Sequence, residues 1–557
     1  MVQISSSNTP EWITRLTTPW VGQSGGSLHG LTFAVKDNID VLGLPTTAGC
    51  EAFAYTASAN ARVVDLLLKA GANLHGKTNL DQFACGLNGT RSPWGAVPNA
   101  FDARYVSGGS SSGSARVVST GQVDFALGTD TAGSGRIPAG LNNIVGLKPS
   151  KGLISARGVV PAAQSVDCVS IMARSVATAV KVLKATAMHD PLDPYSRALN
   201  LCTQAWPKRL RFGVPKTLEF FGDRQSELAF QLAIDHMIAL GGEPVQFDYA
   251  PFAQAATLLY ESALVAERLE AIRSFFEQQP DQVMEPVRTI IGQGHRYSAA
   301  DVFSAWTQLK ALEQQTRLVW QSFDVMLVPT APTHYTIEAM QKDPIALNRN
   351  LGHYTNFVNL LDYAALSVPS SLREDGLPFG ITLIAPAGSD LQLAELGQRY
   401  HHASGMTQGA TGLPLPAPEP ILSAQQGDCI SVAVVGAHLS GMPLNHQLTE
   451  RGAHLLEVTT TSQDYKLFAL PDANPPKPGL LRVQPGSGGA IEIEIWSMPI
   501  AAYGSFVSLI PSPLGIGTLK LIDGRTIQGF LCEPCALNGA QDITHWGGWR
   551  AYVQSLG

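Results

Sequence analysis

Two clusters rich in glycine and serine interrupt the N-terminal half of the chain: SGGSSSGSAR at residues 107–116 and GTDTAGSGRIP at residues 128–138. This composition is typical of a flexible linker, because Gly and Ser contribute little to a hydrophobic core. Both clusters, however, lie between stretches that have the apolar patterns of buried strands and helices. Small residues inside a folded domain allow close backbone approaches and tight turns. A fold for this chain therefore has to give both clusters a place in its interior.

The segments around these clusters follow a strand–helix–strand order. Residues 31–41 (LTFAVKDNIDV) predict a buried strand that ends near Lys36, and residues 72–79 predict another short strand. Between them, residues 61–72 carry apolar side chains at helical spacing and end at Gly71. This order predicts an α/β domain whose central sheet is parallel or mixed. Residues 110–122 then predict a helix with serine at its N-cap.

The rest of the chain changes character twice. Residues 175–320 are mostly helical in pattern, whereas FDVMLVPTAPT (323–333) and FGITLIAP (379–386) predict buried strands. A Pro-rich stretch predicts a semi-rigid linker at 411–427, and short β-like runs follow it. In these runs IEIEIW alternates like a half-exposed strand, and LIDGRTI carries an Asp-Gly hairpin turn. We therefore expect domains at 1–410 and 428–557, joined by that linker.

Composition excludes several classes of function. The chain has 557 residues with 45% hydrophobic and 15% charged residues, as in soluble globular proteins, and its net charge of −7 gives no basic footprint for nucleic acid. It shows no membrane-length apolar run and no secretory signal. Seven cysteines, an odd number in a long chain, predict reduced thiols in a cytoplasm, and the lone CEPC pair lacks the further ligands of a zinc site.

Three residues stand where nucleophilic chemistry could be built: Lys36 at a strand end, Ser110 in the first cluster and Ser134 in the second. A serine hydroxyl is a weak nucleophile that needs an adjacent base, and lysine serves as that base only when neutral. Taken singly, each has an ordinary interpretation: a surface lysine, a linker serine and a turn.

Taken jointly, these features resemble the amidase signature family. The resemblance covers roughly residues 25 to 405 and is carried by AVKDNID, KTNLDQFACG, SGGSSSGSA, ALGTDTAGSGRIPAGLNNIVGLKPS, MLVPTAPT and LPFGITLIAP. It implies the amidase signature fold, a mixed central sheet covered by helices. It also implies a Ser–cis-Ser–Lys triad in which Ser134 is the nucleophile, Ser110 the bridging serine and Lys36 the base. The chain departs from the usual motif at Ser112, Ala132 and Gly135.

The family mechanism makes specific demands on these positions. Burial would have to lower the pKa of Lys36 from roughly 10 towards 7 or 8. Ser110 would pass the proton of Ser134 to Lys36 and is held in the family by a cis peptide bond, here Gly109–Ser110. The family's oxyanion loop aligns with Thr131, Ala132, Gly133 and Ser134, whose N–H groups would meet the tetrahedral oxyanion.

Within the family, NGTRSPWG (88–95), GVVPAAQSVDCVSI (158–171) and LYESALVAERLEAI (259–272) resemble the allophanate hydrolase branch. This resemblance implies that Tyr260 and Arg268 hold the substrate carboxylate, with Gly86 and Asn88 as further substrate-binding positions. Helical spacing would place Tyr260 and Arg268 on one face of a helix.

The implied reaction hydrolyses allophanate (urea-1-carboxylate), a small anionic amide, to ammonia and N-carboxycarbamate. It requires no metal and no cofactor. The resemblance also leads us to expect functional coupling to a urea carboxylase and a homodimer, with no nucleic-acid or membrane partner.

The last domain resembles the C-terminal domain of allophanate hydrolases, which is distantly similar to γ-glutamylcyclotransferase-like folds. The resemblance, carried by GAHLSGMPLNHQLTERGA, PGLLRV, IEIEIW, PSPLGIGTLKLIDG and GGWRAY, implies that this domain decarboxylates the first product. His438 is the favoured catalytic residue. His446 and His454 are alternatives, and Glu494 and Arg550 are weaker candidates. A dimerisation or docking module remains the other interpretation of this domain.

Two further functions stay open at this point. One is an amidase for another small carboxylate-bearing amide, such as malonamate, or the amidase component of a transamidation complex. The other is a scaffold with an inactive amidase fold. The presence of all three triad residues argues against the scaffold, because a scaffold has no chemical reason to keep them.

Overall fold

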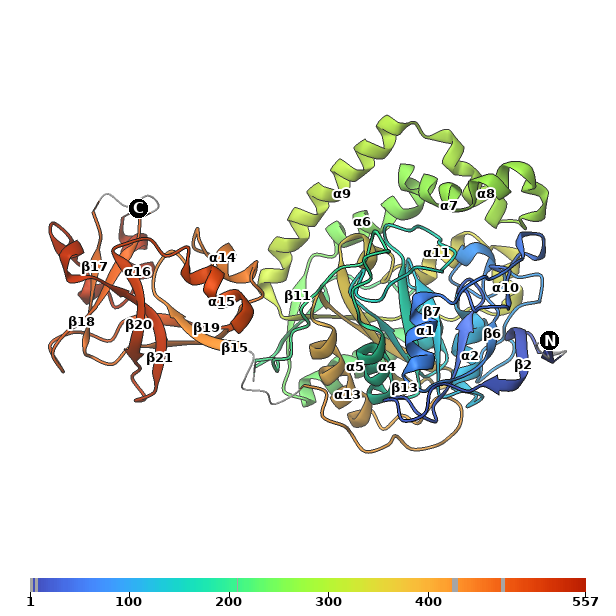
Figure 1. The fold of residues 1–557 in the computed structure, drawn as a ribbon, viewed down its shortest axis with the longest axis horizontal. Coiled ribbons are helices and arrows are strands. Elements are labelled where there is room, and N and C mark those ends of the chain that lie inside the picture. The colour runs from blue at the N-terminus through green and yellow to red at the C-terminus, as the bar shows by residue number, and fades with distance from the viewer. Residues whose placement is uncertain (1–3, 6–8, 208, 423–428, 472–475, 557) are drawn as a thin grey trace. The chain divides into compact units, whose positions relative to one another are not determined.

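The chain folds into two compact units, Met1–Leu422 and Ser423–Gly557 (Figure 1). The computed structural model describes residues 4–5, 9–207, 209–422, 429–471 and 476–556. None of the helices within these ranges is long and apolar enough to span a membrane.

The described part of the first unit is built on a mixed sheet of twelve strands in the order β1-β2-β6-β3-β7-β9-β8-β13-β14-β12-β10-β11. Their bounds are β1 Ile4–Ser5, β2 Trp12–Trp20, β3 Thr32–Lys36, β6 Asn73–Thr78, β7 Phe125–Asp130, β8 Val145–Lys148, β9 Cys168–Ala173, β10 Arg211–Pro215, β11 Glu243–Phe247, β12 Val325–Pro329, β13 Tyr363–Leu372 and β14 Pro378–Pro386. A separate pair is formed by β4 Pro45–Thr46 and β5 Tyr55–Thr56. Strand β3 runs parallel to both β6 and β7, whereas β9 is antiparallel to β7. The predicted mixed α/β sheet is confirmed.

Helices surround this sheet, and α7, α8 and the long α9 stand together at one side of the unit (Figure 1). The helices are α1 Arg62–Lys69, α2 Ser112–Ser119, α3 Arg136–Leu141, α4 Val176–Thr186, α5 Arg224–Ala239, α6 Ala250–Glu261, α7 Ala266–Gln278, α8 Val287–Gly292, α9 Ala299–Val319, α10 Ile337–Lys342, α11 Ala346–Leu351, α12 Phe357–Leu360 and α13 Asp390–Ala403.

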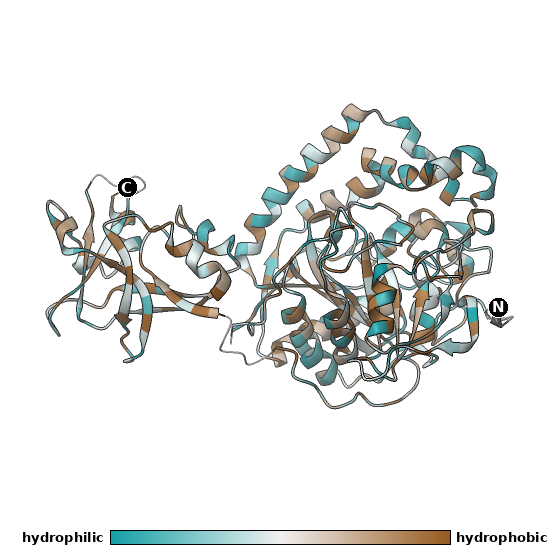
Figure 2. Cartoon of the chain, in the orientation of Figure 1, coloured by the Kyte–Doolittle hydropathy of each residue, from teal (hydrophilic) through white to brown (hydrophobic). Residues whose placement is uncertain are grey.

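Both faces of the central strands are apolar, and Figure 2 shows hydrophobic ribbon, in brown, on strands inside the first unit. In β12, Val325 and Leu327 belong to one core cluster, while Met326 and Val328 belong to the cluster on the other face. Because side chains alternate along a strand, a continuous apolar run fills two cores at once. This explains why FDVMLVPTAPT predicts a buried strand so clearly.

The predicted strand, helix and strand at residues 31–79 are confirmed as β3, α1 and β6, and Gly71 after α1 has φ +94°. The predicted helix at residues 110–122 is α2. Ser111 takes its N-cap position, but the side chain of Ser111 bonds to the backbone of Thr129 instead of capping the helix. The mostly helical region at 175–320 also contains β10 and β11. These five-residue strands are too short for an apolar period to identify.

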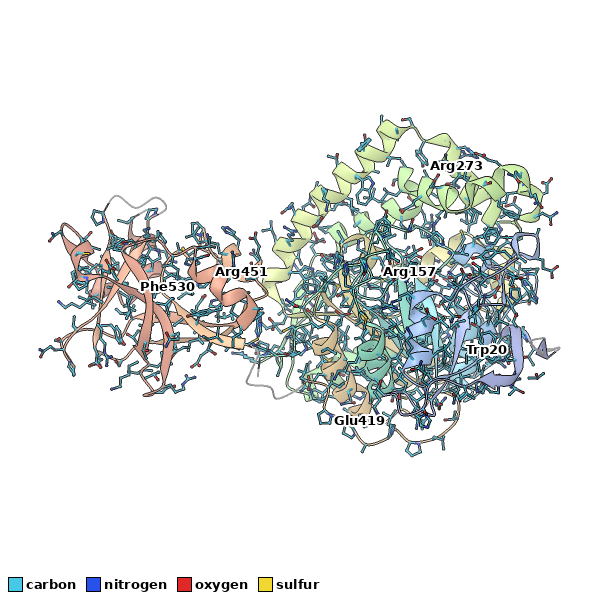
Figure 3. All side chains as sticks on the ribbon, in the orientation of Figure 1. Trp20, Arg157, Arg273, Glu419, Arg451 and Phe530 are labelled. Atoms are coloured by element: carbon cyan, nitrogen blue, oxygen red, sulfur yellow. The ribbon has the colours of Figure 1, made fainter. Side chains whose placement is uncertain are left out.

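Part of the predicted linker at 411–427 lies against the first unit. Ile421 is 5% exposed and belongs to the core cluster, and Glu419, labelled in Figure 3, forms an ion pair with Lys181 at 2.7 Å. The Gln398 amide also donates to the Glu419 carbonyl at 2.7 Å. The extended segment up to Leu422 therefore packs as part of this unit, and residues 423–427 lie outside the described residues.

The second unit is small and rich in β-structure, as predicted. One sheet runs in the order β16 (His454–Thr460), β19 (Glu492–Pro499), β15 (Cys429–Val434), β21 (Thr526–Cys532) and β20 (Leu514–Lys520). A second sheet contains β18 (Pro478–Arg482), β17 (Tyr465–Ala469) and β22 (Gln541–Asp542), and the helices are α14 (His446–Thr449), α15 (Ile500–Val507) and α16 (Trp549–Ser555). The predicted Asp-Gly hairpin joins β20 to β21, and Gly524 supplies the positive φ of +88°.

The interpretation of IEIEIW as a half-exposed strand is wrong. Strand β19 lies between β16 and β15 and is buried along most of its length, with Glu494 only 1% exposed. Alternation suggested a solvent face because glutamate is rarely buried. Here the carboxylate is buried because Arg550 and other donors pair with it.

Candidate active site

The site forms where the carboxyl ends of the parallel strands β3 and β7 meet. Lys36 ends β3 and is fully buried, and its Nζ donates to Ser110 Oγ and to Thr129 Oγ1, each at 2.7 Å. Thr129 lies near the end of β7, and Ser110 comes from the first glycine-serine cluster just before α2. The peptide bond between Gly109 and Ser110 is cis, as expected.

Lys36 has hydroxyl partners but no ion pair among the described residues. Burial lowers the pKa of Lys36 to about 7, although the nearby carboxylates of Asp81, Asp167 and Asp130 act to raise it. A large share of this amine is therefore neutral near pH 7 and has a lone pair available to accept a proton.

Ser134 lies in the loop that follows β7 and is 2% exposed. Its hydroxyl donates to the Gly86 carbonyl at 3.4 Å, and no hydrogen bond joins it to Ser110 among the described residues. Lys36 is thus hydrogen-bonded to Ser110 directly. To pass a proton to Ser110, the Ser134 hydroxyl would have to rotate away from the Gly86 carbonyl. Long contacts of this kind are common in sites without substrate.

The loop that carries Ser134 is held by a buried ion pair. The guanidinium of Arg136 meets the carboxylate of Asp130 through two hydrogen bonds of 2.9 Å, and both side chains are fully buried. Asp130 also accepts the backbone N–H groups of Gly133 at 2.9 Å and Gly135 at 3.1 Å. A carboxylate with this many donors fixes the loop on both sides of Ser134.

The four residues of the predicted oxyanion loop differ in whether their backbone N–H groups are already hydrogen-bonded. Gly133 has φ +131°, and a Cβ there would lie 2.3 Å from Thr355 Oγ1, so only glycine fits. Its N–H is already bound by Asp130, whereas the N–H groups of Thr131, Ala132 and Ser134 make no hydrogen bond in the described part of the chain. Those three are the donors available to an oxyanion.

Asp81 joins the two neighbouring loops to the site. Its carboxylate accepts the N–H groups of Asn88, Gly89 and Arg91 at 3.0–3.2 Å, and its own N–H donates to the Ser110 carbonyl. A Cβ on Gly109 would lie 2.1 Å from Asp81 Oδ2, which explains the glycine there. The Asn88 side chain bonds to Asn348 and Thr90, so it holds its loop in place.

Tyr260 and Arg268 meet, but not on one helix as predicted. The helix breaks at Ser262, because its hydroxyl donates to Leu258 O at 2.6 Å and accepts from Leu264 N at 3.2 Å. Tyr260 therefore lies in the last turn of α6, whereas Arg268 belongs to α7. The Arg268 guanidinium lies 4.9 Å from the Tyr260 ring centre and donates to its hydroxyl at 3.2 Å.

The Arg268 side chain is buried, with the residue only 3% exposed, yet its Nε and one terminal nitrogen have no hydrogen-bond partner among the described residues. A buried cation in this state is costly unless an anion joins it. The structure therefore provides a place for an anionic group.

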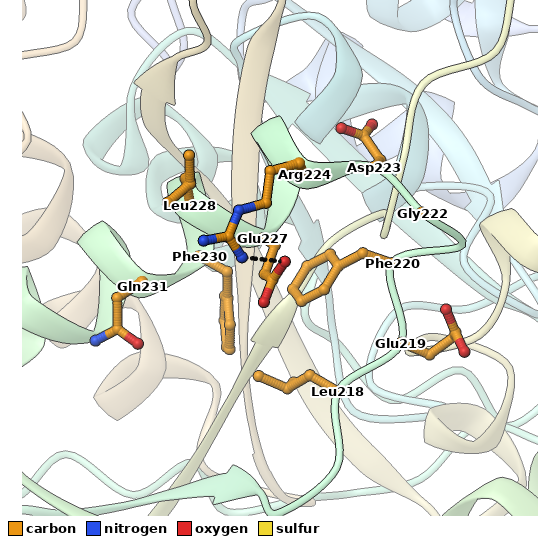
Figure 4. Close-up of a pocket in the computed structure, with 10 residues that line it drawn as sticks. All are labelled: Leu218, Glu219, Phe220, Gly222, Asp223, Arg224, Glu227, Leu228, Phe230 and Gln231. Atoms are coloured by element: carbon orange, nitrogen blue, oxygen red, sulfur yellow. Dashed lines mark hydrogen bonds and ion pairs between the residues drawn. The ribbon is translucent and has the colours of Figure 1, made fainter.

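Tyr260 also lines a cavity of about 520 Å³, together with Leu87, Arg91 and Asn348. The Leu87 N–H donates to the Asn348 side chain at 2.7 Å. Leu87 directly follows Gly86, whose carbonyl accepts the hydrogen bond from Ser134. A different cavity of about 490 Å³ lies at the start of α5 and contains none of the predicted site residues (Figure 4). There the guanidinium of Arg224 is already paired with Glu227 at 2.6 Å.

In the second unit the predicted candidates form two groups. His438 stacks on Phe530, labelled in Figure 3, with 5.1 Å between ring centres, and burial lowers the pKa of His438. Gln447 binds its Nε2 at 2.9 Å. Separately, Arg550 pairs with Glu494 at 2.5 Å and with Glu492 at 2.9 Å.

The two remaining histidines differ in exposure. His446 is exposed on α14, and burial lowers the pKa of His454 on β16.

The structure adds residues that sequence reasoning did not single out: Asp81, Thr129, Asp130, Arg136 and Asp167. All of them lie inside the quoted motifs of the family or of its branch, so a signal was present. Their role in positioning the triad depends on contacts between distant segments, which spacing cannot show.

The mixed sheet, with a buried lysine bonded to a serine at its edge, defines the class of this protein as an amidohydrolase. The chain belongs to the amidase family, whose model matches residues 11–394, and residues 430–554 match the allophanate hydrolase C-terminal domain.

The chain is 44% identical to urea amidolyase of Saccharomyces cerevisiae, over 95% of the chain and 30% of that protein. Urea amidolyase of Lachancea kluyveri is 43% identical over 100% of the chain and 32% of that protein. The chain thus spans about a third of the curated urea amidolyases it matches. A solved structure of Kluyveromyces lactis allophanate hydrolase is 40% identical, with a TM-score of 0.73, and the match covers 100% of this chain and 95% of that one.

Proposed function

We propose that the chain hydrolyses allophanate to ammonia and N-carboxycarbamate. The observation that carries this proposal is the buried Arg268: the Asp167 and Glu267 carboxylates act on it electrostatically, but two of its nitrogens have no hydrogen-bond partner among the described residues. In an amidohydrolase, such a group suits an amide substrate that carries a carboxylate, because a guanidinium binds a planar carboxylate in a bidentate manner. The solved allophanate hydrolase, similar over the whole chain, supports the same substrate.

In the proposed mechanism, neutral Lys36 takes a proton from Ser110 as Ser110 takes one from Ser134. The Ser134 Oγ attacks the ureido carbonyl, and the N–H groups of Thr131, Ala132 and Ser134 stabilise the oxyanion. The proton then returns through Ser110 to the leaving nitrogen, so that the C–N bond breaks and ammonia departs. Water attacks the resulting ester by the same relay and releases N-carboxycarbamate.

For the second unit we propose that His438 assists decarboxylation of this product. The support is a half-buried imidazole whose pKa is lowered by burial, so the ring is neutral at pH 7. Glu494 and Arg550 are paired with each other and would position the loop that contains Ser440.

We further propose that a urea carboxylase supplies the substrate. The relatives named urea amidolyase are about three times longer than the part this chain matches, and their name joins urea to an amide-cleaving activity.

Ammonia release from allophanate, malonamate and propionamide in parallel tests the proposed substrate. We expect the highest kcat/KM for allophanate and the lowest for the uncharged propionamide. Preference for malonamate would replace the substrate but keep the carboxylate site. Preference for propionamide would refute the role of Arg268.

A further inference from the structure

Hydrogen bonds through the turn at residues 162–167 join the oxyanion loop to Glu267, the residue before Arg268. It starts at Thr131, the first residue of that loop, whose hydroxyl donates to Asp167 Oδ1 at 2.5 Å. The Asp167 carboxylate also accepts the backbone N–H groups of Ala162 and Ala163, at 2.8 and 3.2 Å. Asp167 therefore fastens Thr131 to a compact turn formed by residues 162–167.

The other side of this 162–167 turn is bound to α7. The N–H and the hydroxyl of Ser165 donate to the two carboxylate oxygens of Glu267, at 2.6 and 2.7 Å. Glu267 is in the first turn of α7 and directly precedes Arg268. Charge-assisted bonds to both oxygens of one carboxylate are strong and directional, so they fix the start of α7 relative to the turn.

The 162–167 turn itself is stiff. Asp167 N and Val166 N both donate to the Ala163 carbonyl, at 2.9 and 3.0 Å, and the Val166 carbonyl accepts from Asn359 at 2.8 Å. Ala163 and Val166 are 1% and 3% exposed, within the core cluster. A turn packed in this way transmits the position of one end to the other, because a close-packed core does not deform freely.

We propose that the 162–167 turn is a spacer that sets the distance between the oxyanion loop and Arg268, and that Glu267 is the positioning residue that attaches Arg268 to it. The inference rests on the proposed function, in which one substrate is held at both places. In allophanate a single nitrogen separates the carboxylate from the carbonyl that is attacked. A misplacement of about 1 Å between two such contacts costs roughly 100-fold in rate. The spacer would therefore select substrates by the separation of their carboxylate and scissile carbonyl.

The test is a double-mutant cycle on Glu267 and Arg268. Glu267→Gln keeps the side-chain shape but replaces one acceptor oxygen of Ser165 with a donor. We expect it to lower kcat/KM for allophanate about tenfold. In an Arg268→Ala background the same change is expected to have less than about a twofold effect, because the anchor it positions is gone. For propionamide, which has no carboxylate, the expected effect of Glu267→Gln is also under about twofold.

Two controls separate positioning from folding. Glu270→Gln changes an exposed glutamate on the same helix, paired with Arg273 (labelled on α7 in Figure 3), and should leave kcat/KM unchanged. Ser165→Ala removes only the hydroxyl donor. It should lower kcat/KM for allophanate less than Glu267→Gln does, and it should leave kcat/KM for propionamide and the melting temperature unchanged.

Equal losses on allophanate and propionamide, or full additivity of Glu267→Gln with Arg268→Ala, would overturn the spacer. If wild-type protein prefers malonamate to allophanate, the proposed substrate fails. The same double-mutant cycle measured with malonamate then tests the spacer role of the 162–167 turn independently of the substrate.

Discussion

Among the described residues, the first unit has buried ion pairs such as Arg136–Asp130 beside buried basic groups that have no ion pair, whereas the buried Glu494 of the second unit is paired. In the second unit, Glu494 is buried and paired with Arg550 at 2.5 Å, and it also accepts from Ser440 and Trp496. In the first unit, Lys36 and Arg268 are buried with no ion pair among the described residues. An unpaired buried charge reduces stability, whereas a paired one holds loops together. Lys148 and Arg91 are also buried without an ion pair, but backbone carbonyls accept hydrogen bonds from them. Lys36 and Arg268 differ, because Lys36 bonds to a hydroxyl of the proposed relay and two nitrogens of Arg268 have no hydrogen-bond partner among the described residues.

The largest expected effect concerns the nucleophile. Ser134→Ala should lower kcat for ammonia release from allophanate by roughly 10⁴-fold or more, because the neighbouring hydroxyl of Thr131 in the loop after β7 is bound to Asp167. The melting temperature should change little, since the hydroxyl makes only one long contact. Substantial residual turnover, measured by ammonia release with purified variant, would move the chemistry away from Ser134.

Within the first unit, two buried lysines near the ends of neighbouring strands differ in whether they have an ion pair. Lys77 pairs with Asp37 at 3.0 Å, whereas Lys36 has only hydroxyl partners at its Nζ. Lys77→Met should cost about 3–5 kcal/mol in the free energy of unfolding, because Asp37 is left buried and unpaired.

Lys36→Met should leave the free energy of unfolding unchanged or increase it, because a poorly solvated amine is removed. It should lower kcat by roughly 10³-fold. Urea denaturation and ammonia assays on both variants provide the check. A larger loss of stability for Lys36→Met than for Lys77→Met would contradict the distinction.

Substitutions of Arg268 and Arg550 give the next effect in size. Arg268→Ala should raise KM for allophanate by roughly 10- to 100-fold with a smaller change in kcat, because a charge-assisted contact to substrate is lost. Arg550→Ala should instead destabilise the second unit, since Glu494 loses its partner, and should leave KM for allophanate unchanged. An unchanged KM in the Arg268 variant would remove Arg268 from substrate binding.

The smallest expected effect on ammonia release comes from His438→Ala. We expect less than about a twofold change in the initial rate from allophanate, together with slower release of CO₂ from the first product. The His446→Ala variant, which changes an exposed histidine on α14, serves as the control. Normal CO₂ release in the His438 variant would favour a docking or dimerisation role for the second unit.

Sequence patterns and family resemblance predicted much of the fold and the contact between Lys36 and Ser110, because β3, β7 and the glycine-serine clusters carry local signals. The part of Ser134 in the triad stays a prediction. They misjudged the Tyr260–Arg268 segment. A helical period continues through it, but the backbone is extended at Ser262 (φ −131°, ψ 179°), where the Ser262 hydroxyl caps the next turn. They also did not predict that Glu494 is buried, since the alternation of residue types cannot show that Arg550 forms an ion pair with it. The 162–167 turn was equally hidden, because its contacts join residues about 100 positions apart.

Burial lowers the pKa of Lys36 more than the nearby carboxylates raise it, and on this balance rests the proposal that Lys36 is the base. Because only the neutral amine accepts a proton, kcat/KM for allophanate should rise about tenfold per pH unit on the acid side and level off above a pKa of about 7. The pH dependence of kcat/KM, with spontaneous decarboxylation of allophanate subtracted, measures this directly. A limb near pH 7 supports the account. A profile that stays flat from about pH 5 to about pH 8 would contradict it, because a lysine could not then be the group that titrates.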